Sequence, residues 1–95
     1  MSTLHLLSHS PFDDGRLSSC LRLLGPQDAL MLTGDAVYAL LPESPWASQL
    51  QGLKVFALDE DLIARGIQAT STAQALDYSG FVQCCLDFNK VNSWV

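Results

Sequence analysis

Charged side chains are scarce in this sequence of 95 residues: they make up 16% of it, whereas an ordinary globular domain carries about a quarter. A small domain has much surface for its volume, so a shortage of charge leaves apolar side chains exposed. The sequence is 48% hydrophobic and its mean hydropathy is +0.20. We expect another chain to cover part of this surface, and an apolar monomeric domain is the alternative.

Basic residues are the scarcer of the two charge types. Five Lys and Arg stand against ten Asp and Glu, which gives a net charge of −5. Binding of nucleic acid needs clustered cations, and here they are scattered along the chain. We therefore expect no direct contact with RNA or DNA.

Long apolar runs and targeting signals are missing as well. No run approaches the roughly 20 residues that cross a bilayer, and the start of the chain lacks the cationic segment of a signal peptide. Three cysteines without framework spacing argue against a secreted, disulfide-linked scaffold. These absences predict a cytoplasmic protein without a membrane-spanning segment.

Cofactor and catalytic motifs are absent. The sequence has no phosphate-binding glycine loop, no C-x-x-C pair and no G-x-S-x-G turn. His5 and His9 are four residues apart with no cysteine near them, so neither a metal nor a cofactor is expected. His9 is a candidate for handling a proton, or an ordinary exposed loop residue. The acidic run 59–61 resembles a Mg²⁺ cluster, but the start of a helix favours acidic residues anyway.

Short strands and helices alternate along the chain. Strands are predicted at residues 4–7, 29–32, 53–58 and 74–77 and within the tail 89–95, with a loop over 67–73. Helices are predicted over residues 17–24, 36–41, 46–50, 60–65 and 79–88. This alternation predicts a single α/β domain over residues 1–95, with a mostly parallel, twisted sheet and helices on both faces. Ligands of such sheets bind at the carboxyl ends of the strands, here residues 9–14, 33–35 and 59–61.

Helix boundaries follow from short oxygen-bearing side chains and glycine. The first helix is expected to start at 10–11 or 13–14, where Ser-Pro and Asp-Asp occur. Asp59 and Ser79 are the expected caps of two later helices, and Gly66 is expected just past the end of one of them.

Thiol chemistry is the remaining possibility. Cys20 lies near Arg16 and Arg22, whose charges would favour a thiolate. It also shares a helix face with leucines at 17, 21 and 24, which favours core packing. Cys84 and Cys85 are adjacent in a predicted helix, where their side chains diverge, and we interpret both as core residues.

Several segments, taken in order, resemble the TusB/DsrH family. They are Leu4-His5 followed by Ser10-Pro11-Phe12, the stretch Gly34–Ala39, the stretch Val55–Gly66, the stretch Asp77–Val82, and Ser93-Trp94. In the second segment Gly and Asp stand in the reverse of the family's order. The resemblance covers nearly the whole chain, and it depends on the succession of segments rather than on any one of them.

The resemblance implies a DsrE/F/H-like fold and a subunit of a sulfur relay. Such a chain assembles with TusC/DsrF-like and TusD/DsrE-like subunits as a dimer of heterotrimers, which passes persulfide sulfur from a donor protein to an acceptor. In the Tus branch the destination is 2-thiouridine at the tRNA wobble position, and in the Dsr branch it is dissimilatory sulfur oxidation. The main sulfur-carrying cysteine belongs to the TusD/DsrE-like subunit, so this chain is expected to be auxiliary or non-catalytic.

One site residue is implied by the resemblance. DsrH-like members carry a cysteine in a Ser-Cys-Leu setting, which Ser19-Cys20-Leu21 matches, so Cys20 is a candidate auxiliary sulfur acceptor. A purely structural subunit without thiol chemistry is the alternative. Large aromatic side chains often anchor interfaces, which makes Phe12, Trp46 and Trp94 candidates for contact with partners or for the core.

Overall fold

The structure is a computed structural model, and it describes residues 2–68 and 72–94. It consists of one five-stranded sheet, in the order β4-β3-β2-β1-β5, in which every strand pair is parallel. The strands are β1 (Thr3–Leu7), β2 (Ala29–Leu32), β3 (Lys54–Leu58), β4 (Gln74–Leu76) and β5 (Lys90–Trp94). The predicted parallel α/β architecture is confirmed, including a strand in the C-terminal tail.

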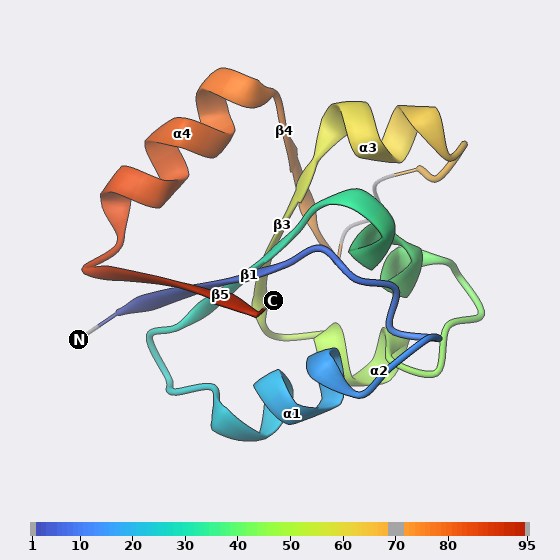
Figure 1. Cartoon of the computed structure of the whole chain (residues 1–95), viewed down its shortest axis with the longest axis horizontal. Coiled ribbons are helices and arrows are strands. Elements are labelled where there is room, and N and C mark those ends of the chain that lie inside the picture. Colours follow the sequence, from blue (N-terminus) through green and yellow to red (C-terminus); the bar gives the residue numbers. More distant parts are fainter. Residues whose placement is uncertain (1, 69–71, 95) are drawn as a thin grey trace.

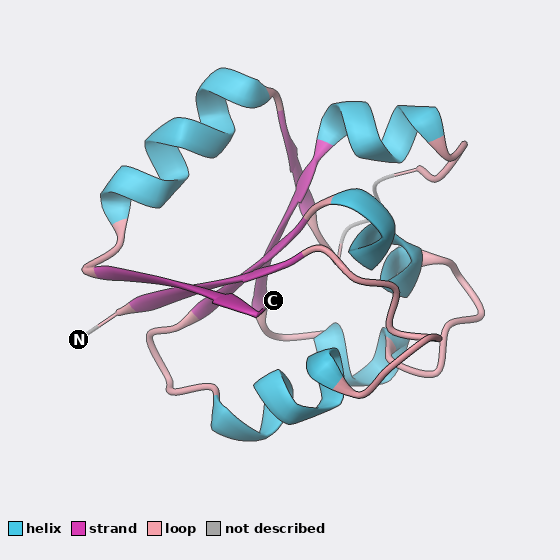
Figure 2. Cartoon of the chain, viewed as in Figure 1, coloured by secondary structure: helices cyan, strands magenta, loops and turns pink. Residues whose placement is uncertain are grey.

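Helices cover the two faces of the sheet unequally. They are α1 (Arg16–Leu23), the 3-10 helix η1 (Gly34–Leu40), α2 (Ala47–Leu50), α3 (Asp59–Ala64) and α4 (Tyr78–Asp87). Buried residues of α1, η1, α2 and α3 share one hydrophobic cluster, whereas α4 contributes to a separate one. Figures 1 and 2 show α4 by itself on one side of the twisted sheet, with the other helices opposite.

The central strand β2 explains why the core has two parts. Side chains along a strand alternate between the faces, and all four residues of β2 are buried. Leu30 and Leu32 join the larger cluster, and Ala29 and Met31 join the cluster under α4. A short run that is apolar throughout is what a strand covered on both faces requires.

Several predicted helix starts are wrong in detail. The helix expected at 79 begins at Tyr78, and its cap is Asp77, whose carboxylate accepts from the Gly80 amide at 2.7 Å. Asp59 is the first residue of α3 rather than its cap, and no side chain caps that helix.

Of three further helix boundaries, two differ from the prediction and one agrees with it. The helix expected over 36–41 is a 3-10 helix that starts at Gly34. The first helix starts at Arg16, whose amide donates to Asp14. Gly66 follows α3 at φ +65°, as predicted. In the loop expected over 67–73, residues 69–71 lie outside the described residues, as does residue 95 of the tail.

Candidate functional site

The carboxyl ends of β1, β2 and β3, where ligands of such sheets usually bind, are joined by contacts within the chain. The amide and the hydroxyl of Thr33 both donate to the Leu7 carbonyl, at 2.9 and 3.1 Å. The next amide, that of Gly34, donates to Asp61 Oδ2 at 2.8 Å. Gly34 has φ +50°, and a Cβ there would lie 3.2 Å from the Ser8 carbonyl oxygen. The close approach of these two loops explains why a glycine stands at position 34, and the bond to its amide gives Asp61 a structural role.

Arg65 completes the same contact between α3 and η1. Its Nε and Nη2 donate to Asp35 Oδ1 at 3.0 and 2.8 Å, and its Nη1 donates to the Asp61 carbonyl at 3.1 Å. The guanidinium carbon also lies 5.9 Å from the centre of the Tyr38 ring. The bond to Asp35 raises the pKa of Arg65 above its usual value. The acidic run 59–61 therefore contributes a structural contact through Asp61.

No metal site accompanies these carboxylates. Among residues 2–68 and 72–94, no group of three or more His, Cys, Asp or Glu side chains is placed to hold an ion. His9 is exposed, in the loop after β1.

Cys20, the candidate sulfur acceptor, has no exposed surface. Burial first, and the charge of Asp28 second, raise the pKa of its thiol to about 12. The expected stabilisation of a Cys20 thiolate by the two arginines is not present. Arg16 forms an ion pair with Asp14, and Arg22 is an exposed residue of the last turn of α1. The prediction that these arginines favour a thiolate is wrong, because desolvation and a carboxylate dominate the environment of the sulfur.

Cys84 and Cys85 line the layer between α4 and the sheet. Cys84 is buried and Cys85 is half-buried. Burial is the largest cause that raises the pKa of each thiol. Both belong to the cluster under α4, as the interpretation as core residues predicted.

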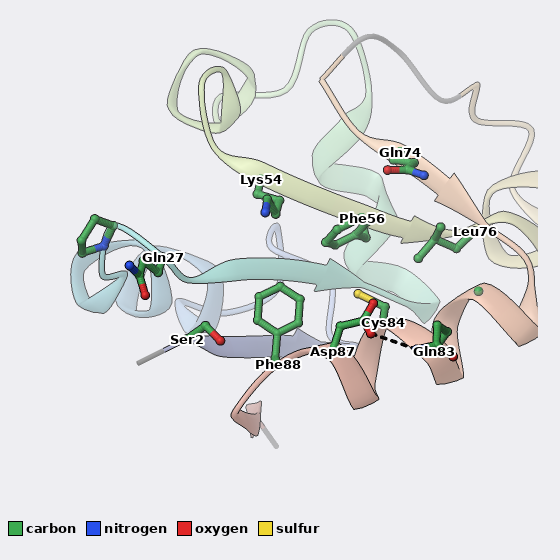
Figure 3. Close-up of a pocket in the computed structure, with 12 residues that line it drawn as sticks. Ser2, Gln27, Lys54, Phe56, Gln74, Leu76, Gln83, Cys84, Asp87 and Phe88 are labelled. Atoms are coloured by element: carbon green, nitrogen blue, oxygen red, sulfur yellow. Dashed lines mark hydrogen bonds between the residues drawn. The ribbon is translucent and has the colours of Figure 1, made fainter.

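A groove of about 750 Å³ lies beside α4, as Figure 3 shows. Lys54 and Gln74, the first residues of β3 and β4, stand at one side, and Asp87 and Gln83 of α4 stand at the other. The groove therefore opens near the amino ends of the strands. Ligands of parallel sheets bind at the opposite ends, so the groove lies away from the end of the sheet where ligands usually bind.

A buried network that the sequence analysis missed joins His5 to the C-terminal strand. The Trp94 indole donates to His5 Nδ1 at 3.1 Å, and His5 Nε2 lies 3.2 Å from Asp28 Oδ2. An indole nitrogen can only donate, so Nδ1 carries no proton and Nε2–H donates to Asp28. Asp28 also accepts from the amides of Gly25 and Thr3, at 2.9 and 3.0 Å. The bond from the Gly25 amide is the largest cause that holds the pKa of Asp28 below its usual value.

The three aromatic candidates for an interface have different environments. Trp94 is tied to His5 and packs against the larger cluster. Trp46 also packs against that cluster, and it meets Phe12 edge to face at 4.9 Å. Phe12 is 55% exposed, beside a hollow of about 350 Å³. Trp94 is therefore a half-buried residue that packs against the core, and Phe12 is the exposed one.

The fold defines a class of protein before any sequence comparison does. The YchN protein of Escherichia coli superposes with a TM-score of 0.79, at 20% identity, over 99% of this chain and 100% of that one. A protein of unknown function from Methanobacterium thermoautotrophicum superposes with a TM-score of 0.67, at 14% identity, over 96% of each chain. These likenesses show the fold alone: a small, parallel α/β domain.

Sequence comparison identifies the family within that class. The family of DsrH-like proteins matches residues 9–91. The TusB proteins of Escherichia coli and Shigella boydii are each 35% identical over 95 aligned positions, which cover 96% of this chain and 99% of the relative. The chain belongs to the TusB/DsrH family of sulfur-relay subunits.

In the part of the chain that the structure describes, no helix has the length and apolar character needed to span a bilayer.

Proposed function

We propose that this chain is the TusB-type subunit of a cytoplasmic persulfide relay that supports 2-thiouridine formation at the tRNA wobble position. Its partners are TusC/DsrF-like and TusD/DsrE-like subunits, arranged as a dimer of heterotrimers. The observation that carries the proposal is 35% identity to TusB proteins over nearly the full length of both chains. Dissimilatory sulfur oxidation is the alternative pathway, which the Ser19-Cys20-Leu21 match to DsrH-like members favours.

The chain's contribution to the relay is architectural. Contacts of Gly34, Asp61 and Arg65 hold the loops at the carboxyl ends of the strands together. The thiol of Cys20, in the first helix, is buried. A thiol with a pKa of about 12 is almost entirely protonated at neutral pH, whereas the thiolate is the nucleophile. This environment supports a structural subunit that leaves sulfur transfer to a sister chain.

Sulfur acceptance by Cys20 is the second candidate function. In that reaction the Cys20 thiolate would attack the terminal sulfur of a donor persulfide. The donor's S–S bond breaks, the donor leaves as a thiolate, and Cys20 becomes the persulfide, with no net oxidation or reduction. The burial of Cys20 means that α1 has to move before a donor persulfide can reach the thiol.

Deletion of this subunit from its host and complementation with variants tests both candidates. The wild-type chain should co-purify with both sister subunits and restore 2-thiouridine, measured by mass spectrometry of tRNA nucleosides. Cys20→Ser should restore it equally if the chain is architectural, and Cys84→Ser is the matched control. Loss of thiolation with Cys20→Ser in an intact complex would instead assign the sulfur step to Cys20. A wild-type chain that forms no complex would contradict the whole proposal.

A further inference from the structure

The solvent side of α4 carries a row of exposed apolar side chains. Tyr78, Val82 and Leu86 are 66%, 41% and 73% exposed, and their spacing of four residues places them along one side of the helix. We call these three residues the α4 ridge. The other large exposed hydrophobic residues of the described chain are distributed over different elements: Phe12, Leu23, Leu53, Ile63 and Val91. Single exposed apolar residues are ordinary on a protein surface, but a row of three is not.

The charge of α4 adds to this contrast. Of its ten residues, only Asp87 is charged, and the capping residue Asp77 precedes the first turn. By comparison, the eight residues of α1 include two arginines, and the first turn of α3 has three acidic residues. A helix that water covers normally carries charges on its outer side. The ridge is therefore better suited to a protein partner than to solvent.

The layer that α4 forms is also incomplete. It is the one helix among the described residues on this face of the sheet, and the groove of about 750 Å³ runs beside it. Half-buried apolar side chains, including Phe56, Leu76 and Phe88, line that groove (Figure 3). A partner that lies over α4 would therefore continue onto a surface that is already partly apolar.

We propose that the α4 ridge docks a sister subunit of the relay, through an apolar surface bracketed by basic side chains. This inference rests on the proposed function. Asp77 and Asp87 stand at the two ends of α4, about 15 Å apart at 1.5 Å per residue. A second copy lying antiparallel would bring the Asp77 end of one helix to the Asp87 end of the other, at both ends. Each copy also has a net charge of −5. Like charges at both ends of the helices disfavour pairing with a second copy. A different chain that places cations opposite Asp77 and Asp87 would be favoured as the partner.

Two leucines provide a matched test. Leu86 on the ridge is 73% exposed, and Leu23 on α1, which packs on the opposite face of the sheet, is 68% exposed. Leu86→Glu and Leu23→Glu each place one carboxylate at a solvent-facing leucine, so both should fold, and circular dichroism and thermal unfolding check this. Binding to purified TusC/DsrF-type and TusD/DsrE-type subunits of the same organism is measured for each. We expect Leu86→Glu to weaken the complex about 30-fold or more, because a carboxylate would be buried against an apolar partner surface, and Leu23→Glu to leave it unchanged.

The outcomes separate this inference from the proposed function. Assembly of the wild-type chain and of both variants with equal affinity would retain the relay complex but overturn the ridge as its docking surface. Equal weakening by both variants would overturn it too, since the effect would not be local to α4. Hydrogen exchange of the wild-type complex provides a readout without a variant: α4 amides should gain protection on assembly, and unchanged exchange would contradict the inference.

The charge of the partner is tested separately. Asp87 accepts from the Gln83 side chain at 2.9 Å, and Asp87→Asn keeps an acceptor for that bond while it removes the charge. We expect roughly two- to fivefold weaker binding and a shallower dependence on salt. Unchanged affinity and salt dependence would refute basic side chains at that end. If the isolated chain forms a dimer that Leu86→Glu disrupts, the ridge belongs to a second copy, and the assignment to a sister subunit is wrong.

Discussion

The bond between Trp94 and His5 gives a sharp prediction about stability. Trp94→Phe keeps an aromatic ring on β5 but removes the indole N–H that donates to His5 Nδ1. His5 is only 6% exposed, so water has little access to the nitrogen that loses its partner. The histidine keeps its other bond, to Asp28. The substitution therefore isolates one buried acceptor.

The expected cost is about 2 kcal/mol. A buried polar atom left without a partner costs roughly 1–3 kcal/mol, and Trp94 is half-buried at the edge of the sheet, which permits some relaxation. Because a domain of this size has only about 5–15 kcal/mol of stability, the loss is large. It corresponds to a decrease in Tm of roughly 10 °C.

Urea unfolding, followed by circular dichroism, measures this cost. The midpoint should fall while the slope m stays constant, because the substitution changes stability and not the surface exposed on unfolding. The matched control is Trp46→Phe, since the Trp46 indole bond to Ser18 Oγ is long, at 3.5 Å, and exposed. We expect the loss of that hydrogen bond to cost less than about 0.5 kcal/mol, because a long bond that is open to water contributes less than a well-formed one.

A double-mutant cycle with His5→Leu decides whether the two residues are coupled. The two losses should fall short of additivity by about 1 kcal/mol, because either substitution already breaks the same bond. Nitrogen-15 NMR should also find the proton of the neutral ring on Nε2. Equal midpoints for Trp94→Phe and the wild type, or a neutral ring with its proton on Nδ1, would refute the reasoning.

Three other residues support further predictions. Cys20 should resist iodoacetamide at pH 8 in the native protein but react in urea. The pKa of its thiol is raised from 9.0 to about 12 in the folded protein. The stability that this shift contributes is therefore complete below about pH 9 and is lost as pH rises towards 12. Alkaline unfolding of Cys20→Ala and of the wild type measures this loss. Asp28→Asn should cost about 2 kcal/mol in urea unfolding at pH 7. The lowered pKa of Asp28 makes its contribution full above pH 3.8 and lost as pH falls through the folded pKa, so the gap between variant and wild type should close in acid. Gly34→Ala should cost about 1–2 kcal/mol, because φ is +50° there, and an unchanged urea midpoint would contradict this.

The sheet was predictable because local pattern and tertiary structure agree. Residues 29–32 form a short run that is apolar throughout, and such a run serves a central strand covered on both faces. The tail was less certain from its pattern, since four of the five residues of β5 are exposed. Its pairing with β1 is what defines it as a strand.

Helix caps were the least predictable feature of the fold. Asp77 and Ser79 are both good capping residues two positions apart, and sequence alone does not choose between them. The chain leaves β4 at Leu76, so the first free helical amides lie within reach of Asp77 and not of Ser79. Asp59 loses the same role because α3 begins directly at the end of β3, with Leu58 in the capping position.

The environments of His5 and Cys20 depended on contacts distant in sequence. His5 and Trp94 are 89 residues apart. They meet because β5 pairs with β1 in a register that places Trp94 opposite Leu7. His5 and Leu7 are two residues apart on β1 and share a face of the sheet, so the Trp94 side chain can reach His5 diagonally. The charge near Cys20 likewise comes from Asp28, which a turn beginning at Gly25 brings back towards α1. Spacing along the chain pointed to Arg16 and Arg22 as the charges near Cys20, because it shows only neighbours in sequence and not the contacts that the fold creates.

The family-like motif over residues 55–66 has a physical explanation that bears on function. Asp61 and Arg65 hold η1 against α3, and Gly34 permits the loops to approach, so these residues close the sheet edge where ligands usually bind. A closed edge has few groups available for chemistry, and no buried side-chain nitrogen or oxygen of the described residues lacks a hydrogen bond. The exposed apolar side chains that form a row lie on α4, whereas the others are distributed over different elements. If the chain contributes to the relay by what it binds, as proposed, substitutions on the α4 ridge should reduce sulfur transfer only as far as they reduce assembly.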